Sequence, residues 1–172
     1  MKKLTVLLVV VTTILVVSCA STPSSKVTFD VEIEYESESP TVMLEVTPSW
    51  AKNWVYGDGF RGFYCTFKNT TEKTVKIVWD ESSLNYNGNT YVPFLEGQKY
   101  INAQDPMSPA AITKGGTISK GVYSSNQPHY VSGSGWTMIP IRSNEVQLLF
   151  LVKSEKGEEY ITAIIKAIIV EE

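Results

Sequence analysis

The sequence predicts an all-β protein that folds as a two-sheet antiparallel sandwich. Three observations support this class: eight or nine short stretches alternate apolar and polar residues, turn-forming residues separate them at regular intervals, and no stretch has a clear helical pattern. The end of the chain allows two interpretations, because residues 160–170 would also place their isoleucines on one face of a helix. We predict a strand there, since β-branched residues favour extended backbone. A helix would change the class to α+β.

The first nineteen residues have the pattern of an export signal. Two lysines precede an apolar run of about 14 residues, fewer than the roughly 20 that a membrane-spanning helix needs. Residues 16–19, Val-Val-Ser-Cys, resemble the lipobox of bacterial lipoproteins. The resemblance implies that a signal peptide of residues 1–18 is cleaved off after Ser18 and that Cys19 carries diacylglycerol. An uncleaved anchor and an ordinary signal peptide are the alternatives.

The predicted mature chain has one domain, a lipid anchor and no nucleic-acid partner. Removing residues 1–18 leaves 154 of the 172 residues, enough for one domain with a sizeable core. It also removes two of the 15 basic side chains, so 13 remain against 18 acidic ones, a formal charge of −5 if the amino terminus is acylated. Such an acidic chain is a poor nucleic-acid binder, and an anionic membrane surface does not attract it electrostatically. We expect residues 19–25 to be a lipidated cysteine and flexible tether, and residues 26–172 to be the domain. The lipid on Cys19 would hold it in the cell envelope, at the outer face of a bacterial membrane.

Four strands are predicted in the first half of the domain. Residues 26–35 alternate strictly, and residues 41–47 form a second apolar-rich stretch. Residues 62–68 alternate again, and residues 75–79 repeat the same inward phase after a turn, which predicts a hairpin that ends at residues 80–83. The predicted core side chains of this hairpin are Phe63, Cys65, Phe67, Val75, Ile77 and Trp79.

The second half mixes strands with longer connections. Asn87 and Gly88 provide the positive φ angles of a tight hairpin turn between residues 84–86 and 90–92. Pro93 ends that strand or places it at a sheet edge. The remaining predictions are irregular connections at residues 96–111 and 124–135, a strand within residues 112–123, and a final hairpin in which residues 146–152 and 160–170 flank Gly157.

Part of this pattern is similar to a known group of proteins. Residues 67–82, from Phe67 to Ser82, and residues 97–100 with the proline-containing connection after them, resemble uncharacterised bacterial lipoproteins that have immunoglobulin-like sandwiches. The resemblance covers about half of the mature chain and implies an immunoglobulin-like two-sheet sandwich for residues 26–172. Its motifs are hairpin and core signals, so it implies no mechanism.

The sequence indicates no catalytic, cofactor or metal site, and we predict that the protein is not an enzyme. His129 is the only histidine, and Ser124, Ser125 and Ser132 near it do not lie in a Gly-x-Ser-x-Gly motif. Asp58, Asp80 and Glu81 lack the spacing of a calcium loop. A pair of carboxylates for glycoside hydrolysis remains open, because the two partners need only be close in space.

Cys65 and Asn69 could each have a chemical role, but we expect a structural role for both. Cys65 alternates with apolar neighbours, so we expect a small core residue and not a nucleophile. Asn69 begins an Asn-Thr-Thr triplet that matches a glycosylation acceptor, but on a hairpin turn in a bacterial lipoprotein we expect it to serve the turn.

The candidate contact surface is the aromatic loop of residues 48–60, which contains Trp50, Trp54, Tyr56 and Phe60. These side chains could stack on a sugar or anchor a protein partner, or they could fold back over the end of the sandwich as part of the core. We predict a non-catalytic protein-interaction or structural module with an envelope protein as partner, because no polar cluster marks a ligand pocket. A saccharide-binding module that uses the loop from Trp50 to Phe60 is the alternative, and a hydrolase is a third.

Overall fold

The computed structural model describes residues 27–36, 41–51 and 57–171, and side chains within residues 31–36, 41–51 and 57–167. The predicted signal peptide, Cys19 and the tether therefore lie outside the described residues. The chain divides into two compact units, residues 1–29 with 169–172 and residues 30–168. In the first unit the described residues, 27–29 and 169–171, are extended strand. The second unit holds the two main sheets and is described below.

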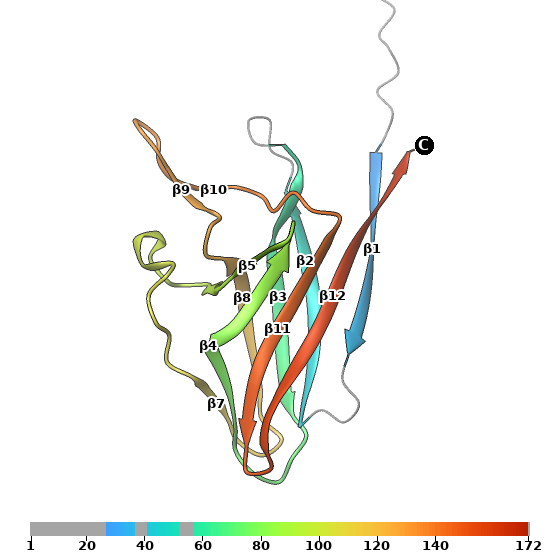
Figure 1. The fold of residues 1–172 in the computed structure, drawn as a ribbon, viewed down its shortest axis with the longest axis vertical. Helices are drawn as coiled ribbons and strands as arrows, with labels where there is room; N and C mark the ends of the chain where they lie inside the picture. The colour runs from blue at the N-terminus through green and yellow to red at the C-terminus, as the bar shows by residue number, and fades with distance from the viewer. Residues whose placement is uncertain (1–26, 37–40, 52–56, 172) are drawn as a thin grey trace, which may run out of the picture. The chain divides into compact units, whose positions relative to one another are not determined.

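The predicted all-β class is confirmed for the described residues (Figure 1), in which the regular elements are strands and one short 3-10 helix. The helix is η1 (Tyr100–Asn102). The strands are β1 (Val27–Glu36), β2 (Val42–Ala51), β3 (Gly59–Asn69), β4 (Val75–Tyr86), β5 (Asn89–Tyr91), β6 (Pro93–Leu95), β7 (Ala110–Ile112), β8 (Thr117–Ser124), β9 (Pro128–Val131), β10 (Gly135–Met138), β11 (Glu145–Ser154) and β12 (Gly157–Glu171).

The strands form two main sheets and one hairpin. One sheet has the order β1-β12-β11-β4-β5, with β7 also paired to β4, and the other has the order β2-β3-β8-β6. Strands β9 and β10 form a separate two-stranded sheet. The pairs whose register is resolved are all antiparallel.

The core lies between the two main sheets and is centred on three aromatic rings. Trp79 of β4 and Phe150 of β11 come from one sheet, and Phe67 of β3 comes from the other. Their centroids are 4.9 to 6.1 Å apart with edge-to-face geometry, an arrangement that aromatic quadrupoles favour. Phe67 is fully buried and Trp79 is only 2% exposed, so the prediction that these side chains of β3 and β4 face the core is confirmed.

The predicted hairpin between residues 62–68 and 75–79 is wrong. Strand β3 pairs with β2 and β8, whereas β4 pairs with β5, β7 and β11 in the other sheet. Alternation reveals which side chains face the core but not which strand lies alongside, so two consecutive strands that face each other across the core have the same pattern as a hairpin. The connection between β3 and β4 therefore crosses from one sheet to the other (Figure 1).

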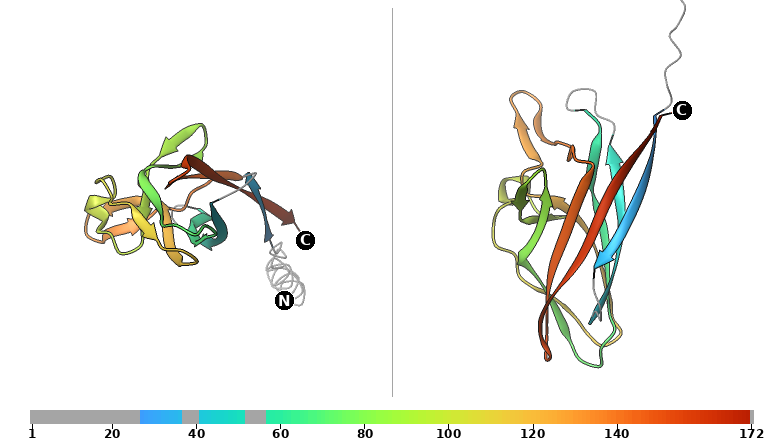
Figure 2. Two further views of the ribbon diagram at one scale, coloured as in Figure 1. Left: turned by 90° about the horizontal axis from the view of Figure 1, so that it is seen from below. Right: turned by 45° about the vertical axis from the view of Figure 1, so that its right-hand side comes forward.

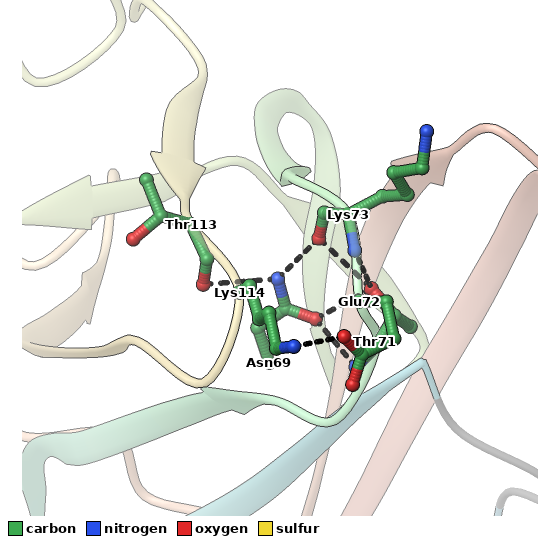
Figure 3. A network of polar contacts seen from close by, with 6 residues as sticks. All are labelled: Asn69, Thr71, Glu72, Lys73, Thr113 and Lys114. Carbon is green, nitrogen blue, oxygen red and sulfur yellow. Dashed lines mark hydrogen bonds and ion pairs between the residues drawn. The ribbon is translucent and has the colours of Figure 1, made fainter.

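Asn69 holds this crossing in place (Figure 3). Its buried amide nitrogen donates to the carbonyls of Lys73, Ile112 and Thr113 at 2.7 to 3.1 Å, and its oxygen accepts from the backbone nitrogen and hydroxyl of Thr71 at 2.8 Å. An ion pair between Lys114 and Glu72 joins the same two segments at the surface. Asn69 therefore serves the connection after β3, as predicted, although this connection joins two sheets and is not the predicted hairpin turn.

Strand β4 does not end at residues 80–83 as predicted but continues to Tyr86. The register with β11 shifts between Leu149 and Leu151, which indicates a bulge. Ser82 lies in it, where its hydroxyl donates to the Val78 carbonyl at 2.6 Å and accepts from the Leu151 nitrogen at 3.1 Å. A polar run that resembles a turn in the sequence is therefore an irregular part of one strand.

The two predictions that rest on turn-forming residues in the second half, at Asn87-Gly88 and at Pro93, are confirmed. Asn87 and Gly88 have φ angles of 50° and 73°, and β5 follows at Asn89. Strand β5 ends at Tyr91, and Pro93 begins β6, which lies at the edge of the other sheet. The C-terminal segment is a strand, β12, and not a helix.

Residues 124–135, predicted to be irregular, contain one strand and the start of a second. Strands β9 and β10 form a hairpin with Trp136 opposite Tyr130. The hairpin lies at the end of the second unit opposite the β3–β4 connection (Figure 2). The sequence did not predict this hairpin, because its strands have only four residues each and the polar residues Ser132, Gly133 and Ser134 between them resemble an irregular loop.

Candidate functional site

The predicted contact loop of residues 48–60 is largely part of the sheets. Strand β2 continues to Ala51, and β3 begins at Gly59. Phe60 is fully buried, and its ring packs edge-to-face on Trp50, which is half-buried, at 5.0 Å. Phe60 is therefore a core residue and not a contact residue. Trp54 and Tyr56 lie outside the described residues.

A different group of aromatic side chains surrounds a cavity of about 550 Å³, here called the aromatic groove. Its lining comes from five elements and the residues next to them. The continuous segment 94–101, which includes parts of β6 and η1, meets β3, β8 and β10 from other parts of the chain. The lining includes Arg61, Phe94, Glu96, Lys99, Tyr100, Ile101, Tyr123, Trp136 and Met138. Volume and composition are those of a typical ligand pocket.

The aromatic rings of the groove form a connected series. Buried Phe94 lies 6.0 Å from Tyr123 and 5.8 Å from Tyr100. Tyr100 in turn lies 6.2 Å from Trp136, and Trp136 lies 5.7 Å from Tyr130 across the β9–β10 hairpin. Tyr100 and Trp136 are 37% and 45% exposed. The series thus begins in the protein interior and ends in rings that a ligand can reach.

Two glycines make room for the floor of the groove. A Cβ atom on Gly62 would lie 2.5 Å from the Tyr123 ring, and one on Gly121 would lie 2.9 Å from the Glu96 carboxylate. The Tyr123 ring could not keep its place beside any other residue at position 62, whereas the flexible Glu96 side chain could move away from a Cβ at position 121. The backbone nitrogen of Glu96 also donates to the Gly121 carbonyl at 2.8 Å, which fixes the start of the following turn.

Charged side chains of both signs line the groove. Arg61, Glu96 and Lys99 have no ion pair with any other part of the chain that the structure describes. Burial raises the pKa of the Tyr123 hydroxyl, and the negative charge of Glu96 raises it further, while Arg61 acts in the opposite direction. Tyr123 therefore stays a neutral hydroxyl at physiological pH, and it lies within the field of both charges.

A second cavity of about 340 Å³ adjoins the groove, because the two share Arg61, Tyr100, Trp136 and Met138 in their linings. Gln127 connects this region to the sheets: its amide nitrogen donates to the carbonyls of Arg61 and Ile139 at 3.0 and 3.1 Å, and its oxygen accepts from the Ser124 nitrogen at 2.7 Å. Gln127 is buried, so the β9–β10 hairpin that carries Trp136 is anchored to both sides of the site.

The other sequence candidates do not assemble into a reactive site. Ser124 is buried and bonds to Tyr86 and Asn126, while His129 is exposed on β9. Cys65 is fully buried, as predicted, and burial raises the pKa of its thiol, which keeps it protonated and unreactive. Within the described ranges, no three His, Cys, Asp or Glu side chains are placed to hold a metal ion. No helix there has the length and apolar character needed to span a membrane.

Comparisons with known proteins add little. No family model and no curated protein matches the chain. A solved structure described as the X-ray structure of Northeast Structural Genomics Consortium target SoR45 is 15% identical to it. That similarity covers 77% of this chain and 87% of the other, with a TM-score of 0.34, which supports no conclusion about function.

The groove residues were missed in the sequence because their aromatic side chains are dispersed along the chain. Phe94, Tyr100, Tyr123 and Trp136 each lie in a separate element, so no local cluster indicates them. The one local signal was Trp136, a large aromatic residue directly after a glycine-rich polar stretch. An aromatic residue in such a setting is commonly held at the surface by a turn.

Proposed function

We propose that the protein is a bacterial envelope lipoprotein, anchored by lipid on Cys19 at the outer face of a membrane, whose immunoglobulin-like domain is a non-catalytic interaction module. The lipobox-like residues 16–19 support the anchor. Two antiparallel sheets that share one core support the sandwich. In this proposal the domain holds another component of the envelope in place and leaves it chemically unchanged.

The observation that carries the proposal is the aromatic groove. Exposed rings of Tyr100 and Trp136 offer large, rigid contact area, the kind of side chain that dominates binding energy at interfaces. Among the described residues, Glu96 is the one carboxylate in the lining, so the groove lacks the pair of carboxylates that glycoside hydrolysis requires, and the lining contains no serine, cysteine or histidine. Such a lining fits binding without catalysis.

The proposal is tested by photo-cross-linking in living cells. Ile101 lines the groove and is 74% exposed, so a benzophenone amino acid there should capture whatever occupies the groove. The matched control is the same amino acid at Tyr160, an exposed aromatic position on β12 outside the groove lining. We expect a discrete adduct from position 101 that disappears when Trp136→Ala is added. No adduct, or the same adduct from both positions, would contradict the proposal.

The anchor has its own test. Cys19→Ala should abolish incorporation of labelled fatty acid and leave a precursor that is not cleaved, because the modified sulfur is the lipid attachment point that the lipobox resemblance implies. Cys65→Ala is the matched control, since Cys65 is the only other cysteine and lies in the core. Metabolic labelling followed by gel mobility measures both effects. Normal labelling and maturation of the Cys19 variant would rule the anchor out.

A further inference from the structure

We propose that the occupant of the aromatic groove is a neutral saccharide of at least two linked rings. This inference rests on the proposed function of the groove as a binding site and names the chemical class that it takes. It moves the saccharide interpretation away from the loop of residues 48–60, where Phe60 is buried, to a site made by β3, β6, η1, β8 and β10.

The aromatic rings provide the first step of the argument. A pyranose ring has a face of C–H groups that packs on an aromatic ring, while its hydroxyls point outward to polar partners. Tyr100 and Trp136 are partly exposed and border both cavities, and Phe94 closes the groove behind Tyr100. The site thus combines an apolar platform that is open to solvent with a buried apolar base.

The charges provide the second step. Arg61 and Lys99 can only donate hydrogen bonds, and the Glu96 carboxylate can only accept them. A cationic ligand would be repelled by Arg61 and Lys99, and an anionic ligand could pair with them but could not donate to Glu96, whereas hydroxyl groups both donate and accept. A neutral polyhydroxyl ligand can therefore satisfy Arg61 and Glu96 at the same time without carrying a charge into the groove. The polar cluster that the sequence did not reveal is formed by these side chains in the fold.

The two cavities set the length of the ligand. Arg61, Tyr100, Trp136 and Met138 line both, so these residues lie between a cavity of about 550 Å³ and one of about 340 Å³. A chain of linked rings can place one ring in each cavity and present its linkage to the shared residues. A single ring could occupy only one of the two cavities at a time.

The site is also preformed in the structure. Gln127 connects the hairpin that carries Trp136 to the Arg61 and Ile139 carbonyls, and Gly62 leaves room for the Tyr123 ring. A pre-organised site loses little conformational entropy when it binds.

The test is calorimetric titration of the full lipidated protein in a detergent without a sugar head group. The probes are two neutral disaccharides, cellobiose and N,N′-diacetylchitobiose, and an uncharged proline octamer, because extended proline-rich segments also bind aromatic grooves. We expect saturable binding of at least one disaccharide. Trp136→Ala should weaken it at least about tenfold through loss of the stacking face, and Tyr160→Ala should leave it unchanged.

Arg61→Gln is the second variant, since Arg61 is exposed and its substitution should not disturb folding. It should also weaken disaccharide binding several-fold by removing charged donors. Disaccharide binding that is unaffected by both variants would place the saccharide elsewhere and overturn the inference. Binding of the proline octamer alone would also overturn it, while the groove would remain an interaction site. Absence of all binding together with absence of the Ile101 adduct would reject the proposed function as well.

Discussion

Replacing Trp79 with alanine should lower the free energy of unfolding by about 3–5 kcal/mol, the range for removal of a large aromatic side chain from a core. Trp79 is 2% exposed and contacts Phe67 and Phe150, one from each sheet. Its loss would leave a cavity at the centre of the core and remove two edge-to-face pairs. The surrounding side chains belong to paired strands of both sheets, so the site has little freedom to collapse.

Urea denaturation followed by circular dichroism measures this effect. The matched control is Tyr64→Ala, because Tyr64 is a large aromatic residue on the outward face of β3 and is mostly exposed. We expect the control to cost less than about 1 kcal/mol. Similar values for the two variants would mean that Trp79 does not occupy the centre of the core.

Asn69→Ala should destabilise the protein by about 2–4 kcal/mol, because it removes the partners of several buried backbone groups at once. The carbonyls of Lys73, Ile112 and Thr113 would lose a donor, and the Thr71 nitrogen would lose its acceptor. The variant Asn69→Asp should be at least as unstable. It keeps the acceptor for Thr71 but places a negative charge beside three carbonyl oxygens.

Thermal unfolding of both variants measures the prediction, with Asn89→Ala as the matched control. Asn89 is an exposed asparagine at the start of β5 whose side-chain nitrogen donates to the Asn87 carbonyl at 3.0 Å. Its substitution should change stability by less than about 0.5 kcal/mol. A loss of stability at Asn69 no larger than at Asn89 would show that water replaces the amide group without cost.

The fold was predictable to the extent that it depends on local patterns. The alternation of Phe63 with Phe67 and of Ile77 with Trp79 showed which side chains face the core, because successive residues of a strand point to opposite faces. The turn at Asn87 and Gly88 was also predictable, because these residue types readily adopt the positive φ angles that it requires. Pairing was predictable for hairpins with a clear turn, β4 with β5 and β11 with β12. The pairings of β3 with β8 and of β4 with β11 were not, since those partners come from distant parts of the chain, as Val152 opposite Ile77 illustrates.

The candidate site was less predictable than the fold. The loop from Trp50 to Phe60 has the highest local density of aromatic residues, yet Phe60 is directed into the core by the alternation of β3. The aromatic groove depends on contacts between elements, such as the one between Tyr100 and Trp136, and on the small size of Gly62. A sequence carries such information only through the complete fold.

The pairing of β4 with β11 also has a kinetic consequence. Lys76 lies opposite Lys153, so nearly half of the 172-residue chain must be closed into a loop before this pair can form. Proteins with such distant contacts fold slowly, in milliseconds to seconds for all-β domains. The contact between Trp79 and Phe150 at the centre of the core depends on this pairing, so we expect it to form late in folding, when β11 reaches β4.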